Sequence, residues 1–336
     1  MKPLLFFLFL FFLLNGANGC RVVKAVERCS PKTNTSFLFA YSNDMDPMEM
    51  SSTYQMVWTS IHIFRSPHIV NYGNVRFDTP LQDNITYGSL GDSWQNIRAN
   101  PPDAEVGFKS AETGSDILSV IQKFLTNTEI PLCGARILIF LSRKAKTEDT
   151  TVIEELLKKY HITFSVILPN TLLGPPDSMN LYNLARKSNG VGLFIGEQIG
   201  GFQYAPFFDN RTLLYAENFD VSSKGVMELR HMKVPHSGRF DLLMNVQDHP
   251  LSDAFVSATF SVKNLLSGEV SELYANYTTL EVGTMREVPR RTAIHQLFVL
   301  NEGTYEVKFN YEYSTDDVEQ VYVRVYSQVL LDYWVP

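Results

Sequence analysis

Residues 36–47 read SFLFAYSNDMDP. The first half of this stretch is apolar and predicts a buried β-strand, and a short polar loop follows it. Asp46 and Pro47 then fit the N-cap and the first position of a helix. In an open α/β sheet, such a loop lies at the carboxyl end of a strand, where ligands usually bind. The side chains of this loop therefore decide whether the domain can hold a metal ion there.

Strand and helix patterns alternate from residue 33 to residue 199. Strands are predicted at Ser36–Phe39, Asn74–Phe77, Arg136–Leu141, Ile162–Leu168 and Val191–Ile195. Apolar residues at helical spacing predict helices that begin near Asp46, Thr113, Glu148 and Asp177. Several of the strands are continuous apolar runs, which is typical of strands buried on both faces of a parallel sheet. The expected fold of residues 33–199 is α/β, with an open, mostly parallel, doubly wound sheet.

The pattern changes in residues 200–336, where apolar and polar residues alternate with a period of two. The alternation is unbroken in 305–313, and it recurs at Val321, Val323 and Val325 and at Val256, Ala258, Phe260 and Val262. Six or seven short strands in about 130 residues predict an all-β, immunoglobulin-like sandwich. Tyr305 resembles the Tyr of a tyrosine corner, although Val307 occupies the position where immunoglobulin domains carry a Cys.

The amino terminus has the features of a secretory signal peptide. Lys2 precedes the Leu/Phe run of residues 4–14, and small residues follow at 17–19. The run is shorter than the roughly 20 residues that span a membrane, and no later stretch approaches that length. We expect cleavage after residue 19, a short segment at 20–32 and a secreted, extracellular chain without a transmembrane segment. An uncleaved anchor is the alternative.

Charge and glycosylation signals fit this location. Removal of Lys2 leaves 28 basic against 36 acidic residues and no basic cluster, so nucleic acid is not an expected partner. Asn-x-Ser/Thr sites occur at Asn34, Asn84, Asn210 and Asn276. Passage through the secretory pathway would make these sites available for glycosylation.

The order of strand, polar loop and capped helix, with 136–141 as a later central strand, resembles the von Willebrand factor type A (VWA) domain. Residues 181–192, LYNLARKSNGVG, are similar to the last helix, turn and strand of that family. The resemblance covers residues 33–197 and is closest to secreted nematode proteins that carry such a domain.

VWA domains that bind ligands through a metal carry Asp-x-Ser-x-Ser after the first strand, and the resemblance carries these positions over to this chain. The leading Asp is replaced by Ala40, and the two Ser positions fall at Ser42 and Asp44. The Asp after the central strand is replaced by Arg143. Since a hard divalent cation needs carboxylate ligands and Arg carries a permanent charge, we expect a degenerate site without a metal or other cofactor.

The same alignment implies a ligand-binding rim. Its candidate residues are Ser42, Asp44, Arg143 and Thr113, the last taking the family's Thr position, which otherwise falls at Ala111. Arg143 is a candidate reader of a partner's carboxylate through charge-assisted hydrogen bonds. The alternative is that Arg143 belongs to an ordinary basic surface loop.

The resemblance also places two cysteines together. The first and central strands are neighbours in the VWA sheet, and Cys29 and Cys133 each precede one of them. A Cys29–Cys133 disulfide is therefore our first choice in an oxidising compartment. Alternatively, Cys20 replaces Cys29 in the disulfide; otherwise its thiol stays free.

Catalytic signatures are missing from the sequence. It contains no HExxH, CxxC, P-loop or Gly-x-Ser-x-Gly motif, and His231 and His236 have no ligand partners at metal-binding spacing. We therefore expect a non-enzymatic recognition or adhesion protein that binds an extracellular protein or glycan. The alternatives are metal-dependent adhesion through non-standard ligands, an enzyme whose site converges only in three dimensions, and a purely structural role.

Overall fold

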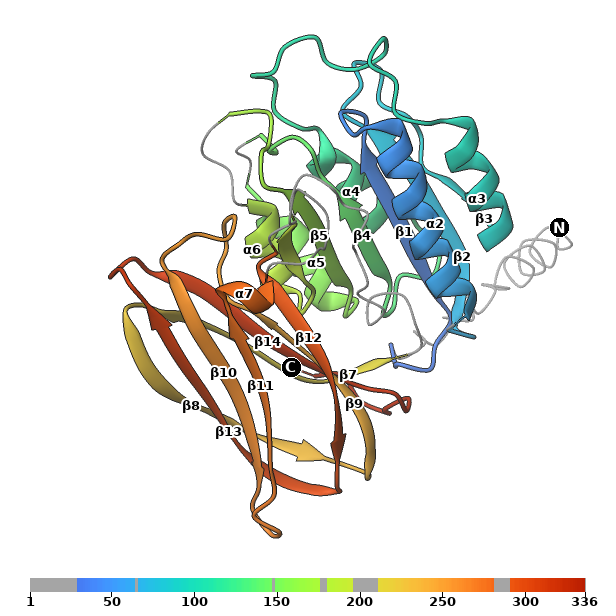
Figure 1. Ribbon diagram of the computed structural model, residues 1–336. Helices are drawn as coiled ribbons and strands as arrows, with labels where there is room; N and C mark the ends of the chain where they lie inside the picture. The colour runs from blue at the N-terminus through green and yellow to red at the C-terminus, as the bar shows by residue number, and fades with distance from the viewer. Residues whose placement is uncertain are drawn as a thin grey trace, which may run out of the picture.

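The computed structural model describes residues 29–63, 66–146, 149–175, 180–195, 211–280 and 291–335. They form an α/β domain followed by a β-sandwich (Figure 1). The predicted signal peptide, Cys20, Glu148, Asp177 and Asn210 lie outside the described residues. Within those residues, no helix is both long and apolar enough to cross a membrane.

The α/β domain is built on a six-stranded sheet with the order β3-β2-β1-β4-β5-β6. Its strands are β1 (Thr35–Ser42), β2 (Ile69–Phe77), β3 (Thr86–Gly88), β4 (Arg136–Phe140), β5 (Thr163–Pro169) and β6 (Gly192–Ile195). Its helices are α2 (Pro47–Ile63), α3 (Leu90–Ala99), α4 (Ile117–Leu125), α5 (Thr151–Lys159) and α6 (Asn180–Lys187). All pairings are parallel except that of β2 with β3. The predicted open, mostly parallel sheet is therefore confirmed.

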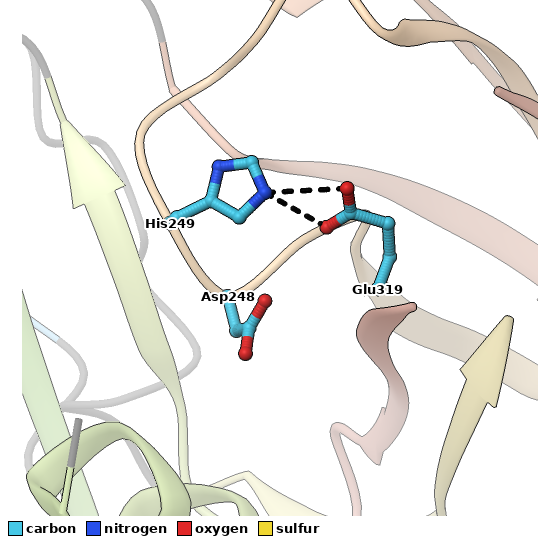
Figure 2. A group of neighbouring side chains, drawn as sticks. All are labelled: Asp248, His249 and Glu319. Atoms are coloured by element: carbon cyan, nitrogen blue, oxygen red, sulfur yellow. Dashed lines mark hydrogen bonds and ion pairs between the residues drawn. The ribbon is translucent and has the colours of Figure 1, made fainter. Parts of the chain in front are cut away.

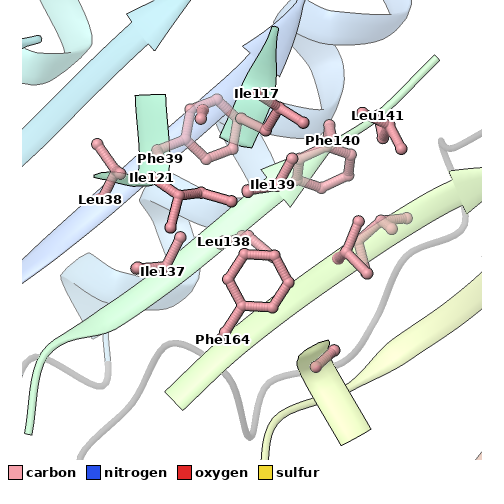
Figure 3. Close-up of a cluster of buried hydrophobic side chains, with 14 of the residues drawn as sticks. Leu38, Phe39, Ile117, Ile121, Ile137, Leu138, Ile139, Phe140, Leu141 and Phe164 are labelled. Carbon is pink, nitrogen blue, oxygen red and sulfur yellow. The ribbon is translucent and has the colours of Figure 1, made fainter. Parts of the chain in front are cut away.

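The core of this domain lies around the neighbouring strands β1 and β4. Phe39 pairs with Leu138 in a parallel register, so the first strand does lie beside the central one. Figure 3 shows their side chains packed with Ile117 and Ile121 of α4. Helices α2 and α3 pack together on one face of the sheet, and α4 and α5 pack on the other (Figure 1). Strands covered on both faces have continuous apolar sequences for this reason.

Side-chain hydrogen bonds cap the start of α2, which was predicted, and of α3, which was not. Asp46 accepts hydrogen bonds from the backbone N–H groups of Met48 and Glu49, as an N-cap does. Helix α3 was not predicted, although Ser89 and Asp92 form a capping box at its start. Its apolar stripe is short, and β3 before it has three residues, so neither element has a strong periodic signal.

The second domain has two antiparallel four-stranded sheets, β11-β10-β13-β8 and β12-β9-β14-β7. Its elements are β7 (Thr212–Val221), β8 (Lys224–Val234), β9 (Gly238–Asn245), β10 (Phe255–Asn264), β11 (Val270–Asn276), α7 (Tyr277–Leu280), β12 (Ala293–Leu300), β13 (Gly303–Tyr313) and β14 (Glu319–Ser327). The described residues thus hold eight strands, where six or seven were predicted. The hydroxyl of Tyr305 donates to the carbonyl of Asn301 at 2.8 Å, which is the hydrogen bond of a tyrosine corner.

Two predicted alternations in the sandwich were wrong in detail. Val256 is exposed and Phe255 is buried, because a register shift between Phe255 and Ser257 interrupts the period. Strand β14 is buried on both faces, since Tyr322 and Arg324 are inaccessible as well as the valines between them. The outer face of its sheet packs against the α/β domain.

Hydrogen bonds between polar groups of the two domains lie at the centre of their contact. Tyr322 donates to the carbonyl oxygen of Gly192 at 2.7 Å, and buried Arg324 donates to the carbonyls of Asn189 and Gly190. Backbone groups of Thr292 and Phe194 bond at 3.1 Å, so the β6 edge is covered by the sandwich. Buried polar groups that lose water must find such partners, and together they fix how the domains dock.

A disulfide joins Cys29 to Cys133, which confirms the first-choice pairing. The carboxyl-terminal tail returns to this point, where the indole N–H of Trp334 donates to the carbonyl of Cys29 at 3.3 Å. The ring of Trp334 stacks on His161. It also lies so close to Gly134 that a Cβ there would come within 2.5 Å of the indole.

Candidate functional site

Five loops meet at the carboxyl ends of the parallel strands. We call residues 43–46, 78–85, 100–116, 141–146 and 170–175 the carboxyl-edge rim. Paired hydrogen bonds tie the first and third of these loops, because the amide of Asn43 donates to the carbonyl of Asp103 at 2.8 Å and accepts from its N–H at 2.9 Å. The site predicted from sequence lies within this rim.

A buried ion pair occupies the centre of the rim. The Nε and Nη2 atoms of Arg143 lie 2.7 and 3.1 Å from the two carboxylate oxygens of Asp44, a bidentate arrangement. The Arg143 side chain is 1% exposed and that of Asp44 is 14% exposed. The remaining terminal nitrogen of Arg143 donates to the carbonyls of Ser110, Ala111 and Thr113. All three guanidinium nitrogens are therefore engaged inside the protein.

The structure corrects the predicted role of Arg143. Arg143 was a candidate for binding a partner's carboxylate, but it is buried and its carboxylate is the protein's own Asp44. The alternative of a solvated basic loop is also wrong for this residue. Thr113, the other rim candidate, contributes its backbone carbonyl to Arg143. The pair thus joins the loop after β1, the loop before α4 and the segment after β4.

A second carboxylate, Asp78, lies buried next to this pair. It follows β2 directly and accepts hydrogen bonds of 2.5 Å from the hydroxyls of both Ser42 and Ser115. Its own N–H donates to the carboxylate of Asp116. Burial raises the pKa of Asp78 to about 7, although the two serine hydroxyls oppose the shift. Ser42 is therefore a partner of Asp78 and lies at 0% exposure, away from any external ligand.

Sequence reasoning missed Asp78 and Ser115. Asp78 directly follows a predicted strand, as loop residues at the carboxyl edge of a sheet do, and this position was the available signal. It also adopts a left-handed backbone conformation with φ 66°, which Asp tolerates better than most residues. No local pattern showed that the loop before α4 would bring Ser115 to it.

These residues do not fit a divalent metal at the family position. Ala40 is buried in β1 and offers no oxygen-bearing side chain. Both carboxylate oxygens of Asp44 face the guanidinium of Arg143, and a divalent ion at that point would meet a fixed positive charge. The hydroxyl of Ser42 donates to Asp78. The oxygen atoms at the family's ligand positions, on Asp44 and Ser42, are therefore already engaged by other groups of the protein.

The outer surface of the rim carries large apolar side chains on separate loops or helix starts. Met48, at the start of α2, is 83% exposed, and Leu81, after β2, is 88% exposed. Val106 and Leu173 are also exposed on two further rim loops. Solvent-facing apolar side chains grouped in one region mark interaction sites more often than isolated ones do.

The described residues also enclose a cavity of about 450 Å³ at the opposite, amino-terminal edge of the sheet, against the sandwich. Its charged lining residues are Arg136, Lys158, Lys187 and Arg211, and its described lining contains no Asp or Glu. Thr35, Ser165 and His161 also line it. A hydrolytic triad needs an acid to orient its base, so this lining does not form one.

Three of the predicted glycosylation sites can be located. Asn34 and Asn84 are exposed, and Asn276 is half-buried at the end of β11. The side-chain oxygen of Asn276 accepts from the N–H of Thr279. His231 is exposed on β8, and the Nε2 atom of His236 lies 3.1 Å from the hydroxyl of Ser327.

Comparisons with known proteins match different parts of the chain. Residues 217–328, within the sandwich, match a family described as a domain of unknown function (DUF7154). A comparison with curated proteins finds no match. Solved structures with similar folds include several VWA domains.

The VWA domain of SpRpn10 is 15% identical with a TM-score of 0.34, and the match covers 49% of this chain and 88% of that one. A VWA protein from Catenulispora acidiphila is 8% identical with a TM-score of 0.35, covering 84% and 59%. Proximal thread matrix protein 1 from the mussel byssus, with a zinc-occupied MIDAS motif, is 14% identical with a TM-score of 0.37, covering 52% and 44%. The chain thus spans less than two thirds of the last two. These values are too low to transfer a ligand or a metal to this chain.

Proposed function

We propose that this chain is a secreted, non-enzymatic recognition protein that binds an extracellular protein through the carboxyl-edge rim without a metal ion. The observation that carries the proposal is the Asp44–Arg143 pair. It replaces a metal with a fixed cation and ties three rim segments together. A preorganised rim loses less conformational entropy when it binds a partner.

The exposed apolar side chains favour a protein partner over a glycan. Met48 at the start of α2 and Leu81 after β2 extend into solvent, whereas Arg143 and Asp78 are buried. Protein interfaces place apolar anchors at their centre and polar groups around them. In this proposal, the exposed apolar side chains contact the partner, and the buried charged residues hold the loops of the rim in place.

Secretion is part of this proposal. The Cys29–Cys133 disulfide is compatible with an oxidising compartment, as are two exposed glycosylation sites and the signal-peptide pattern.

The test is affinity capture from extracellular fluid with the full secreted chain, followed by quantitative mass spectrometry. A Met48→Asp/Leu81→Asp variant should lose a partner that the wild type captures, and EDTA should leave that capture unchanged. Leu266→Asp is the matched control, because Leu266 is almost fully exposed on a distant turn of the sandwich. Loss of capture in EDTA, or equal capture by the double variant, would refute metal-free binding through this rim.

A further inference from the structure

Three side chains with metal-ligand chemistry converge in the sandwich, outside the loops of the rim. Asp248 and His249 lie in the loop between β9 and β10, and Glu319 begins β14 (Figure 2). One ligand atom from each residue lies within 4.8 Å of the others. The Nε2 atom of His249 is 3.2 and 3.0 Å from the two carboxylate oxygens of Glu319. Two segments that are distant in sequence thus bring an imidazole and two carboxylates to one point.

The surroundings leave this cluster short of positive charge. The Glu319 side chain is 3% exposed, and His249 is its one cationic partner among the described residues. Two carboxylates in a partly desolvated place repel each other unless a cation lies between them.

The imidazole is oriented as metal-binding histidines are. Its Nδ1 atom lies 2.9 Å from the carbonyl oxygen of Pro250, which can accept the Nδ1 proton. Nε2 is the ring atom that faces the Glu319 carboxylate, as Figure 2 shows, and without an ion its proton makes the hydrogen bond to Glu319. Loss of that proton would free Nε2 to bind a metal ion. A backbone carbonyl on the far nitrogen is the usual outer partner of a metal-ligating His.

A buried acceptor oxygen next to His249 provides an independent observation. The side-chain carbonyl oxygen of Gln247 has no hydrogen-bond partner, although Gln247 is fully buried and its amide nitrogen lies 3.1 Å from Nδ1 of His249. Buried acceptors without donors are costly, and water molecules bound to a cation are strong donors.

We propose that Asp248, His249 and Glu319 bind one Zn²⁺ ion. Zinc accepts mixed imidazole and carboxylate ligands in tetrahedral sites, with three protein ligands and a water as a common arrangement. Since the His249 side chain is 43% exposed, the cluster is open to solvent on the side of the imidazole. Mg²⁺ and Ca²⁺ prefer oxygen ligands alone, so an imidazole at the centre disfavours them.

Such an ion would reinforce the contact between the domains. The hydroxyl of Tyr182 on α6 reaches the carbonyl oxygens of Gln247 at 3.4 Å and Gln320 at 3.1 Å. These two residues flank the proposed ligands in sequence. A cation joining the β9–β10 loop to β14 therefore holds both acceptors of Tyr182 in place.

The test is isothermal titration of the full, disulfide-bonded chain, freed of metal by EDTA and dialysis, with ZnCl₂, MgCl₂ and CaCl₂. We expect one Zn²⁺ per chain, little binding of the other two ions, and a rise of the melting temperature with ZnCl₂. His249→Gln and, separately, Asp248→Asn should weaken Zn²⁺ binding about ten-fold or more. His231→Gln is the control, since His231 is an exposed histidine of the same domain.

Circular dichroism of each variant in EDTA establishes that it is folded, and the half-buried Asp248 provides a second variant if His249→Gln does not fold. Absence of stoichiometric Zn²⁺ binding by the wild type would overturn the proposal. Binding that both ligand variants retain, or that His231→Gln loses, would place the ion elsewhere and would equally overturn it.

Discussion

Replacement of Arg143 by Met tests whether the buried ion pair organises the rim. Met preserves much of the side-chain length and removes the charge and every donor. Asp44 then stays largely buried without a cation, and three carbonyl groups lose their donor. Removing one partner of a buried pair costs about 3–5 kcal/mol, mostly because the other charge is left uncompensated. We expect a loss of this size in the free energy of unfolding.

The assay is urea denaturation followed by circular dichroism, with the free energy taken from the midpoint and slope. Arg230→Met is the matched control, because Arg230 pairs with Glu217 at 2.8 Å but its side chain is half-exposed. Exposed pairs contribute about 1 kcal/mol or less. The double variant Asp44→Asn/Arg143→Met should be less destabilised than the sum of its single variants, by about 1–3 kcal/mol. An Arg143→Met loss no larger than that of Arg230→Met would refute the reasoning.

Three further predictions concern the buried carboxylate, the disulfide and the domain contact. The pKa of Asp78 is about 7 in the folded protein and 3.8 in its ordinary state, so the folded state binds more protons between those values. Asp78 should therefore lower the free energy of unfolding as pH rises from 4 to 8. In urea titrations, the free energy of unfolding of Asp78→Asn relative to the wild type should rise by roughly 3–4 kcal/mol across that range. A difference that stays constant with pH would contradict this prediction. Cys29→Ser/Cys133→Ser opens a cross-link with a sequence separation of 104 and should cost about 4 kcal/mol in the same assay, whereas a loss under 1 kcal/mol would contradict the assignment. Tyr182→Phe removes the hydroxyl that bonds the sandwich and should cost about 1–2 kcal/mol, and an unchanged urea midpoint would show that this contact is not stabilising.

The proposed rim and the proposed zinc site use different parts of the chain. The rim rests on the loops around Asp44 and Arg143, whereas the zinc ligands lie in the sandwich. Failure of one proposal leaves the other standing. If both hold, an ion near Tyr182 stabilises the sandwich against α6, and recognition itself needs no ion.

The sequence by itself determined most of the strands and helices, and it showed which carboxylates are missing from the loop after β1. The run from Ser36 to Pro47 predicted β1, its loop and the capped start of α2, because strand burial and helix capping are local properties. Ala40 and Arg143 could be read as missing carboxylates without any coordinates. The alternating apolar residues of β13 predicted a strand with one buried face for the same reason.

The tertiary structure alone decided the partners of the polar groups. Arg143 binds Asp44 and Asp78 binds Ser115 because the sheet order brings loops from different crossovers to one edge, and no local spacing encodes that meeting. The burial of both faces of β14 depends likewise on the docking of a separate domain. A buried charge must be compensated by whichever group the fold places beside it. In the loop after β1, the fold therefore decided that the charge of Asp44 is compensated by Arg143.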